Sequence, residues 1–407
     1  RRAAVASATR PAVEVPGARD EVLRPAAVAK VWTGVGAPLE TMAVPGVLLA
    51  PGDVIVAVEL ATLCSSDVHI AAGHRSAPAP MVLGHECVGR VMSIGAGGAL
   101  DVSGAPIALG DRVVWSVAVS GGDCDRCTSA LPQKCRHLRS YGHERIGAHW
   151  ELSGGLATHV HVLAGTAIVP VGERIPARVA APAACGAATA WAALRRAERE
   201  VALPRSIVLV TGAGIVGLSA TAIAADRGAT VIVSEPDKKR RRLARRFGAA
   251  ATIDPCDAGA LETALRGLGV GGVEGVDIAV EASGAPSAVE TALTAVGVGG
   301  VAVLVGSLSP APPVSMDAEA IVRGLVTIAG VQHYTGDDLR DAVETSAGVQ
   351  HYTGDDLREA VEYLRGAWGR HPFEDLVDPV LPLAAADEAL ALAAAGGAFR
   401  VGVDPRR

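Results

Sequence analysis

The segment VLVTGAGIVG, residues 208–217, limits most strongly what this chain can fold into. Its glycines Gly212, Gly214 and Gly217 follow an apolar, strand-forming run and precede an Ala-rich stretch of helical length. The first glycine permits a tight turn, the second lets the backbone approach a pyrophosphate, and the third lets the helix pack closely on the strand. The N-terminus of that helix attracts phosphate groups. The segment therefore predicts a strand-turn-helix unit that binds a dinucleotide.

The next strand-like run, TVIVS (230–234), is followed directly by Glu235. A carboxylate at this point can accept hydrogen bonds from the adenosine ribose hydroxyls, and it would repel a 2′-phosphate. Glu235 therefore favours NAD over NADP. The following run DKKRRRLARRF (237–247) contains seven basic residues and offers an alternative partner for that phosphate, with Arg240 beside the ribose. A solvated helix face is the simpler interpretation of this run.

The arrangement of apolar runs predicts two domains, which the length of 407 residues also favours. Short Val-rich runs separated by Gly, Pro and Asp fill residues 27–181 and indicate a β-rich domain. Apolar strands then alternate with helical stretches over 182–332, which is typical of a doubly wound parallel sheet in the α/β class. Residues 1–26 are expected to form an N-terminal extension, and 333–407 a final segment that returns to the first domain.

The overall charge and the cysteine content narrow the function classes. A net charge of −6 provides no basic surface for nucleic acid. Seven cysteines, including a Cys-x-x-Cys, fit metal or thiol chemistry in a reducing compartment, so a cytoplasmic protein is expected. Residues 207–225 carry no charge and are long enough to suggest a membrane span, but the three glycines assign them to the dinucleotide unit. We therefore expect neither a nucleic-acid nor a membrane partner.

Three residues in separate segments form a candidate metal site. Cys64 lies in LCSSDVHI, His85 in the tripeptide GHE, and Cys185 just before the predicted dinucleotide-binding unit. Thiolate and imidazole groups suit zinc, and a Cys2His set leaves one tetrahedral position open for a substrate oxygen. Each of these residues alone would be an ordinary buried side chain. Their occurrence together with a dinucleotide-binding fold indicates a catalytic metal centre.

The chain resembles the medium-chain, zinc-dependent alcohol dehydrogenase family from about Ala27 to the C-terminus. The family's catalytic-domain and nicotinamide positions are matched by Cys64, Ser66, Asp67, His85, Glu86, Cys185 and Thr189. Its nucleotide fingerprint is matched by Gly212, Gly214, Ile215, Val216, Gly217 and Glu235. The resemblance implies a GroES-like β-rich catalytic domain followed by a Rossmann domain, with the active site in the cleft between them. It also implies a homodimer or homotetramer.

The resemblance further implies reversible oxidation of an alcohol to an aldehyde or ketone, with Zn²⁺ and NAD as cofactors. Zinc on the Cys2His set would lower the pKa of the alcohol hydroxyl. Ser66 would accept the hydroxyl proton and pass it through the cofactor ribose to His69. Asp67 is expected to orient His85, as carboxylates behind metal ligands do. Glu86 is expected to lie behind the metal.

The substrate is expected to be a small-molecule alcohol or carbonyl compound. Four apolar residues on segments that line the pocket in the family are candidates for its wall: Trp115, Val117, Trp150 and Leu156. A narrower resemblance, over 131–144 and 150–170, is to a bacterial subgroup associated with phosphonate metabolism and suggests a hydroxyalkylphosphonate. Four basic side chains on one loop could meet such an anion, although solvated loop charges are the simpler interpretation: Arg136, Arg139, His143 and Arg145.

A second group of cysteines, Cys124, Cys127 and Cys135, departs from the family pattern. Family members with a structural zinc have four cysteines spaced Cys-x2-Cys-x2-Cys-x7-Cys, and Gly121 occupies the first of these positions here. Asp123 or water could complete the site, or this lobe could be free of metal. The sequence leaves these alternatives open.

Two features keep other functions open. Residues 329–340 and 347–358 are identical, AGVQHYTGDDLR, and two copies are too few for a repeat architecture. This duplication, together with Gly121, allows a non-catalytic nucleotide-binding protein of the same fold. Among enzymes, the alternative is a zinc-free medium-chain reductase of activated double bonds, although the Cys2His set counts against it.

Overall fold

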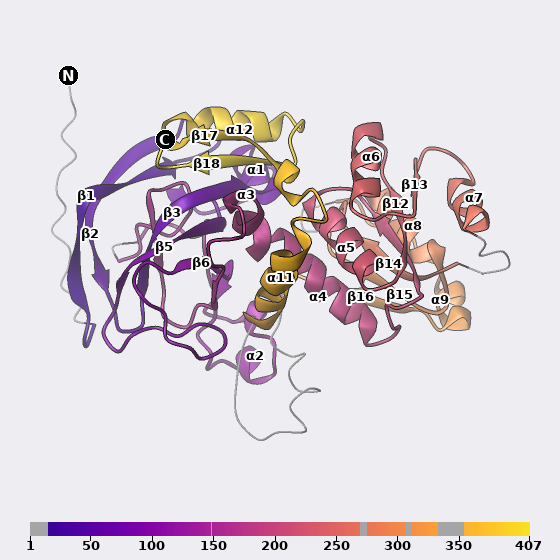
Figure 1. The fold of residues 1–407 in the computed structure, drawn as a ribbon, viewed down its shortest axis with the longest axis horizontal. Coiled ribbons are helices and arrows are strands. Elements are labelled where there is room, and N and C mark those ends of the chain that lie inside the picture. Colours follow the sequence, from indigo (N-terminus) through magenta and orange to yellow (C-terminus); the bar gives the residue numbers. More distant parts are fainter. Residues whose placement is uncertain (1–14, 148, 269–274, 307–310, 333–353) are drawn as a thin grey trace.

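The computed structural model describes residues 15–147, 149–268, 275–306, 311–332 and 354–407, and it has two lobes (Figure 1). One lobe contains the N-terminal strands together with the C-terminal segment, so the indigo and yellow ends of the chain share it. The other lobe contains the later part of the middle of the chain, in magenta to orange. No helix of the described residues combines the length and the apolar character needed to cross a membrane.

The first lobe is built on a seven-stranded sheet and a three-stranded sheet. The larger sheet has the order β10-β6-β5-β3-β18-β17, with β9 also pairing with β3. The smaller sheet has the order β2-β1-β4, and β7 pairs separately with β8. The strands are β1 (Arg19–Trp32), β2 (Glu40–Leu49), β3 (Val54–Leu63), β4 (Met81–Val82), β5 (Glu86–Ile94), β6 (Arg112–Trp115), β7 (Ala118–Val119), β8 (Arg139–Ser140), β9 (His159–Val162), β10 (Ile168–Pro170), β17 (Val377–Pro382) and β18 (Arg400–Asp404).

Strand β3 shows how the sequence organises this lobe. It reads VIVAVELATL and pairs with β5, β9 and β18 along its edges. Its two faces are buried in two cores, with Ile55 in one and Val54 and Val56 in the other. A strand covered on both faces needs apolar side chains on both faces. Strand β18 comes from the other end of the chain and pairs Val401 with Leu63. The C-terminal segment is thereby brought beside the residues that follow β3.

Strand β1 begins inside the segment that was expected to form an N-terminal extension. It starts at Arg19 and pairs with β2 from Arg19 to Val31, with a register shift between Val22 and Ala27. Residues 19–26 are therefore part of a sheet, and residues 1–14 lie outside the described part of the chain.

The second lobe is a six-stranded sheet of order β13-β12-β11-β14-β15-β16, in which every pair is parallel. Its strands are β11 (Ile207–Thr211), β12 (Thr230–Ser234), β13 (Ala251–Ile253), β14 (Val276–Glu281), β15 (Val296–Leu304) and β16 (Thr327–Gly330). Its helices are α4 (Gly186–Glu198), α5 (Ile215–Asp226), α6 (Lys238–Arg246), α7 (Ala260–Gly267), α8 (Pro286–Ala295) and α9 (Ala318–Gly324). The predicted α/β class with a doubly wound parallel sheet is confirmed.

The remaining helices lie in the first lobe or join the lobes. They are α1 (Ser65–Ala71), α2 (Asp125–Thr128), η1 (Pro132–Lys134), α3 (Ala177–Ala180), η2 (Ala181–Ala184), α11 (Gly354–Ala367), η3 (Phe373–Leu376), η4 (Leu383–Ala385) and α12 (Ala386–Ala394). One hydrophobic core runs from the parallel sheet at Val208 and Val210 through η2 and α4 to Val88 and Val114 of the first lobe. Because this core spans the junction, the start of α4 has a fixed position between the lobes.

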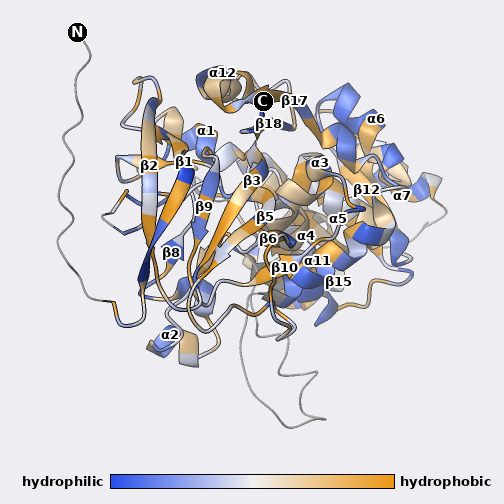
Figure 2. Cartoon of the chain, turned by 60° about the vertical axis from the view of Figure 1, so that its left-hand side comes forward, coloured by the Kyte–Doolittle hydropathy of each residue, from blue (hydrophilic) through white to orange (hydrophobic). Residues whose placement is uncertain are grey.

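Hydropathy follows this arrangement (Figure 2). Strands β3 and β5 are largely apolar, whereas helix α6 is one of the most hydrophilic elements. Most side chains of α6 are at least partly exposed, and Ala244 is its buried residue.

The duplicated segment falls largely outside the described residues. The first copy begins in β16, and the last residues of the second copy form the start of α11. Residues 333–353, which contain the rest of both copies, lie outside the described part of the chain.

Candidate active site

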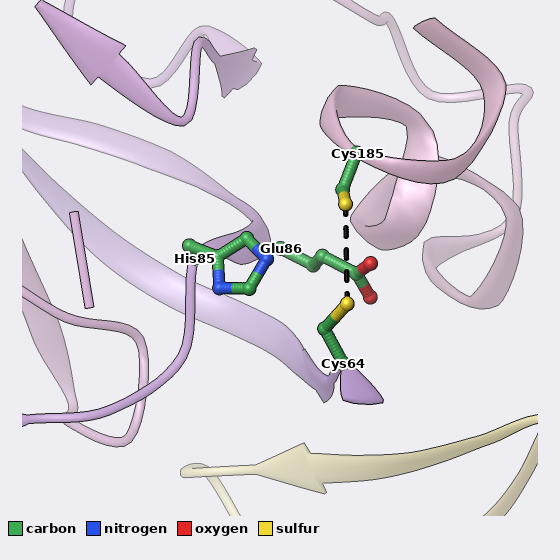
Figure 3. A group of neighbouring side chains, drawn as sticks. All are labelled: Cys64, His85, Glu86 and Cys185. Atoms are coloured by element: carbon green, nitrogen blue, oxygen red, sulfur yellow. Dashed lines mark hydrogen bonds between the residues drawn. The ribbon is translucent and has the colours of Figure 1, made fainter. Parts of the chain in front are cut away.

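Four ligand-type side chains from separate elements meet at the junction of the lobes (Figure 3). Cys64 caps the N-terminus of α1, His85 and Glu86 stand where β5 begins, and Cys185 caps the N-terminus of α4. One ligand atom of each lies within 4.8 Å of the others. The two sulfur atoms, Sγ of Cys64 and Sγ of Cys185, are 4.0 Å apart. The structure therefore brings together the three residues predicted as zinc ligands.

The donor set and its surroundings fit a zinc ion. Cys64 and His85 are buried and Cys185 is half-buried, so a cation here would be largely shielded from water. The hydrogen bond from Cys185 and the charge of Arg400 lower the pKa of Cys64 well below its ordinary value, despite its burial. The same hydrogen bond and burial raise the pKa of Cys185 well above its ordinary value. One sulfur is thus prepared as a thiolate, the form that coordinates metal.

Asp67 lies beside this group, where it was predicted to orient His85. It is fully buried, and its Oδ2 lies 3.6 Å from Nδ1 of His85. That separation allows charge attraction but exceeds a hydrogen bond. Asp67 accepts hydrogen bonds from the backbone N–H groups of Cys64 (2.9 Å) and Gly84 (3.0 Å). It therefore fixes the two chain segments that carry the thiolate and the imidazole, and it places a negative charge beside the imidazole.

The negative charge of Glu86 is balanced by Arg400, which the sequence did not predict as a site residue. Arg400 donates to the Glu86 carboxylate from Nε (2.9 Å) and Nη2 (3.0 Å), and Thr62 donates to it from Oγ1 (2.6 Å). Nη2 of Arg400 also lies 3.4 Å from Sγ of Cys64. All four groups are buried. Arg400 therefore joins the carboxylate to the first thiolate, from a strand at the other end of the chain.

A cavity of about 300 Å³ opens onto these residues. The first lobe contributes Ser66 and His69 to its wall, and the second contributes Thr189 and Val216. Both predicted proton-transfer residues and the predicted nicotinamide contact thus line the same space as the metal ligands. Nδ1 of His69 is buried without a hydrogen-bond partner among the described residues. The cavity belongs to both lobes, as an active site between two domains requires.

The predicted pocket wall needs correction. Of the four apolar candidates, Val117 lines the cavity. Trp115 and Trp150 instead pack in the core between β3, β5 and β9, and Leu156 packs in the core beside β1. Trp115 ends β6, whereas Trp150 and Leu156 lie in the loop between β8 and β9, and all three are buried in these cores.

The predicted loop cations are also mostly elsewhere. His143 lines the cavity, but Arg136 pairs with Asp125 (2.6 Å), Arg139 lies over the ring of Trp150, and Arg145 is exposed. The arginine that does line the cavity, besides Arg400, is Arg75. Nothing in the spacing around Arg75 marked it as a site residue.

The dinucleotide loop has the geometry that its glycines predict. Gly212 has a φ of +95°, and a side chain there would meet Ser283 at 2.8 Å. A side chain at Gly217 would meet the carbonyl oxygen of Gly212 at 1.9 Å, so helix α5 needs glycine to pack on β11. At Gly214, by contrast, no other atom lies within 4 Å of the position that a Cβ would take. This open approach at the N-terminus of α5 is suited to a pyrophosphate.

The comparison with known families decides which family the chain represents. Residues 50–173 match the model "Alcohol dehydrogenase GroES-like domain", and residues 216–348 match the model "Zinc-binding dehydrogenase". L-threonine 3-dehydrogenase of Streptomyces avermitilis is 32% identical over 295 residues, covering 71% of this chain and 79% of the relative. The chain belongs to the medium-chain, zinc-binding alcohol dehydrogenase family.

Two further relatives of this dehydrogenase agree with that assignment. 5-exo-Hydroxycamphor dehydrogenase of Pseudomonas putida is 33% identical over 251 residues, which cover 61% of this chain and 67% of the relative. The crystal structure of an alcohol dehydrogenase from Thermotoga maritima superposes with a TM-score of 0.81 at 27% identity, covering 93% of this chain and 99% of that one. The GroES-like and Rossmann folds are therefore confirmed, and the dehydrogenase is a zinc-binding oxidoreductase of alcohols that uses a nucleotide cofactor.

In this dehydrogenase Glu235 follows β12 and contacts the glycine-rich loop. Its Oε2 accepts a hydrogen bond from the N–H of Ala213 (2.8 Å), and its Oε1 accepts one from the N–H of Asp237 (3.0 Å). Arg240 lies nearby on α6, with its guanidinium 4.7 Å from the centre of the Phe399 ring. It lines a second cavity, of about 650 Å³, together with Lys239, Arg242 and Arg246.

The second cysteine group of the dehydrogenase lies apart from this cleft. The sulfur atoms of Cys124, Cys127 and Cys135 all lie within 4.8 Å of one another. Backbone N–H groups, first that of Arg136, lower the pKa of Cys124 to about 6. All seven cysteines of the chain are free thiols in the structure.

Proposed function

We propose that the protein is an NAD-dependent zinc alcohol dehydrogenase that oxidises a small polar alcohol, with reduction of the aldehyde or ketone in reverse. The observation that carries this proposal is the convergence of Cys64, His85 and Cys185 within 4.8 Å of one another at a cavity lined by both lobes. A set of two sulfurs and one imidazole leaves room for a substrate oxygen on a tetrahedral ion.

The residues around the cavity divide the chemistry among them. Cys64, His85 and Cys185 would hold zinc, which acts as a Lewis acid and lowers the pKa of an alcohol hydroxyl. Ser66 receives the hydroxyl proton, and His69 passes it toward solvent. Thr189 and Val216 stand on the side of the cavity that belongs to the nucleotide-binding lobe, where they would contact the nicotinamide. The nicotinamide, when bound, would supply the hydride acceptor for the alcohol and the hydride donor in the reverse direction.

The coenzyme is assigned to NAD because of Glu235. Its carboxylate is held at the end of β12 by two backbone N–H groups, so it cannot easily turn away from a ribose. A phosphate on the 2′-oxygen would stand against this negative charge. The arginine and lysine side chains of α6 are the counter-argument, but Asp237 lines their cavity as well.

The substrate class follows from the charges on the cavity wall. Arg75, Arg400, His69 and His143 line it, and its lining contains no carboxylate among the described residues. Arg400 is already paired with Glu86, whereas no described carboxylate pairs with Arg75. An alcohol with a carboxylate or phosphonate group would give Arg75 a partner. We therefore favour small hydroxy acids or hydroxyalkylphosphonates over neutral alcohols.

Turnover measurements test this proposal. The zinc-loaded enzyme is offered neutral alcohols, diols, hydroxy acids and hydroxyalkylphosphonates with NAD and, separately, with NADP. We expect NADH formation with anionic alcohols, and we expect Arg75→Leu to raise KM for these substrates while leaving KM for neutral alcohols unchanged. Equal effects on both classes would remove Arg75 from substrate recognition. Faster turnover with NADP would overturn the coenzyme assignment.

Two alternative functions differ from this one in metal content. A zinc-free reductase of activated double bonds has no use for the Cys2His set, and a non-catalytic nucleotide-binding protein has no use for a cavity that joins that set to the nicotinamide side. Zinc bound at Cys64 together with turnover of an alcohol excludes both.

A homodimer is the proposed assembly. Strand β16 is an edge of the parallel sheet, and apolar side chains near that edge are exposed, including Val298 (69%), Val322 (73%) and Leu325 (74%). Light scattering on the purified protein gives its mass in solution and tests this directly.

A further inference from the structure

The cysteine lobe, which is the short segment 120–138 between β7 and β8, holds three sulfur atoms in a compact group. Cys124 caps helix α2, Cys127 lies within that helix, and Cys135 ends the short helix η1. Sγ of Cys124 is 3.5 Å from Sγ of Cys127 and 3.8 Å from Sγ of Cys135. None of the three lines the active-site cavity.

These separations match a metal site better than a disulfide. With zinc–sulfur bonds of about 2.3 Å, the corners of a tetrahedron are about 3.8 Å apart. A disulfide would need sulfurs about 2.05 Å apart. The three sulfur atoms therefore already stand at spacings suited to three corners around one thiophilic cation.

Backbone N–H groups point at these sulfurs. The N–H groups of Gly121 and His137 lie 3.3 Å from Sγ of Cys135, and that of Arg136 lies 3.5 Å from Sγ of Cys124. Such contacts favour negative charge on sulfur, and outer contacts of this kind orient metal ligands. Two of the three sulfurs, those of Cys124 and Cys135, therefore have N–H groups directed at them.

No ligand-type side chain of the described residues completes the group of three sulfurs. A Cβ at Gly121 would lie 3.9 Å from Sγ of Cys135, so a cysteine there would direct its sulfur into the group. Gly121 is not among the glycines with positive φ, and its backbone would accept a side chain. Asp123 is the nearest polar group, with Oδ1 3.2 Å from that Cβ position. Yet among the described residues no fourth Cys, His, Asp or Glu comes within 4.8 Å of all three sulfurs.

We propose that this lobe is an open three-thiolate site, which binds one thiophilic divalent cation such as Zn²⁺ and leaves its fourth position to an exchangeable ligand from solution. Binding releases the protons of those sulfurs that are still thiols. This differs from the closed four-cysteine site implied by the family resemblance, because a closed site offers no position to an outside ligand. The proposal does not depend on the substrate or on turnover.

Cobalt is the probe that tests it. Co²⁺ takes the place of zinc, and its sulfur-to-metal charge-transfer absorption grows with the number of bound thiolates. The full-length Cys64→Ser variant reduces the contribution of the catalytic site, and Cys127→Ser in that background gives the baseline for the lobe. We expect one Co²⁺ per chain at the lobe, with an absorption that changes when a small thiol is added and fills the fourth position.

Gly121→Cys is the matched gain-of-ligand variant. We expect its charge-transfer absorption to rise by about one third, as four thiolates replace three, and its response to added thiol to disappear. The proposal is overturned if the parent protein takes up no Co²⁺ that depends on Cys127, or if added thiol leaves its spectrum unchanged. The thiol titration needs no variant at position 121, so it remains decisive even if Gly121→Cys fails to fold, which circular dichroism would reveal.

Discussion

The two sulfur-rich sites of this molecule have the same kind of donor atom in different surroundings. At the cleft, Cys64 and Cys185 are far apart in sequence, and buried charges on Asp67, Glu86 and Arg400 surround them. In the cysteine lobe, the three cysteines lie within residues 124–135, and backbone N–H groups are their main neighbours. The comparison teaches that a site assembled by the whole fold depends on distant partners, whereas a local site depends on its own loop.

The largest effect is expected from removing a ligand at the cleft. Cys64→Ser should lower kcat/KM on the order of 10³-fold or more, because zinc supplies several kcal/mol of stabilisation in such reactions. Zinc analysis should show that the cleft loses its zinc while the cysteine lobe keeps its metal. Cys256→Ser is the matched control, since Cys256 is an exposed free thiol outside both sites. Equal activity in the two variants would contradict the assignment of the cleft.

The second effect tests the buried charges around the cleft. Arg400→Ala leaves the Glu86 carboxylate buried without its cation, which should cost about 3–5 kcal/mol of unfolding free energy. Urea denaturation measures this loss. Arg323→Ala breaks an exposed ion pair with Glu319 and should cost less than about 1 kcal/mol. If both variants lost the same small amount, Glu86 and Arg400 would not form the tight buried unit described above.

A smaller effect is expected from the positioning carboxylate. Asp67→Asn keeps the shape of the side chain but removes its charge from behind His85, so zinc affinity at the cleft should fall about 10- to 100-fold. Competition with a chromogenic chelator measures that affinity. Asp123→Asn, next to the lobe, should leave the cleft affinity unchanged. An unchanged affinity in Asp67→Asn would limit Asp67 to holding the backbone of Cys64 and Gly84.

The smallest effect on turnover is expected from removing a sulfur of the cysteine lobe. Cys127→Ser should change kcat less than about twofold, because none of the lobe's sulfurs lines the cavity. It should instead abolish part of the stabilisation that added zinc gives. At a zinc concentration a hundredfold above Kd, a site of this kind contributes about 2.7 kcal/mol. Thermal unfolding with and without zinc separates these results, and a large loss of kcat would tie the lobe to catalysis.

The sequence predicted the parts of the molecule whose geometry is local. The glycines 212, 214 and 217 are set by one strand-turn-helix unit, so their spacing was sufficient to place them. The cluster of Cys64, His85 and Cys185 was predicted from the ligand chemistry of these residues beside a dinucleotide-binding fold and supported by the family resemblance, because the three come from separate elements and no spacing links them. In the same way the α/β class followed from the alternation of strands and helices along residues 182–332.

Other features depended on contacts between distant segments. Arg400 reaches Glu86 only because β18 pairs with β3, a pairing between the two ends of the chain that no spacing expresses. Arg75 follows α1 by a few residues and enters the cavity through a loop. Trp115 and Trp150 were expected at the pocket, but tertiary packing places both in a core of the first lobe and not at the cavity. These features depend on tertiary contacts, which composition and periodicity do not predict.

The most direct measurement of the central claim follows activity while zinc is withdrawn from the enzyme. The zinc-loaded protein is treated with increasing chelator, and zinc content and alcohol-dependent NADH formation are measured on the same samples. We predict that turnover falls in proportion to the zinc held by Cys64, His85 and Cys185 and returns when zinc is restored. Undiminished turnover in protein stripped of all zinc would contradict the account.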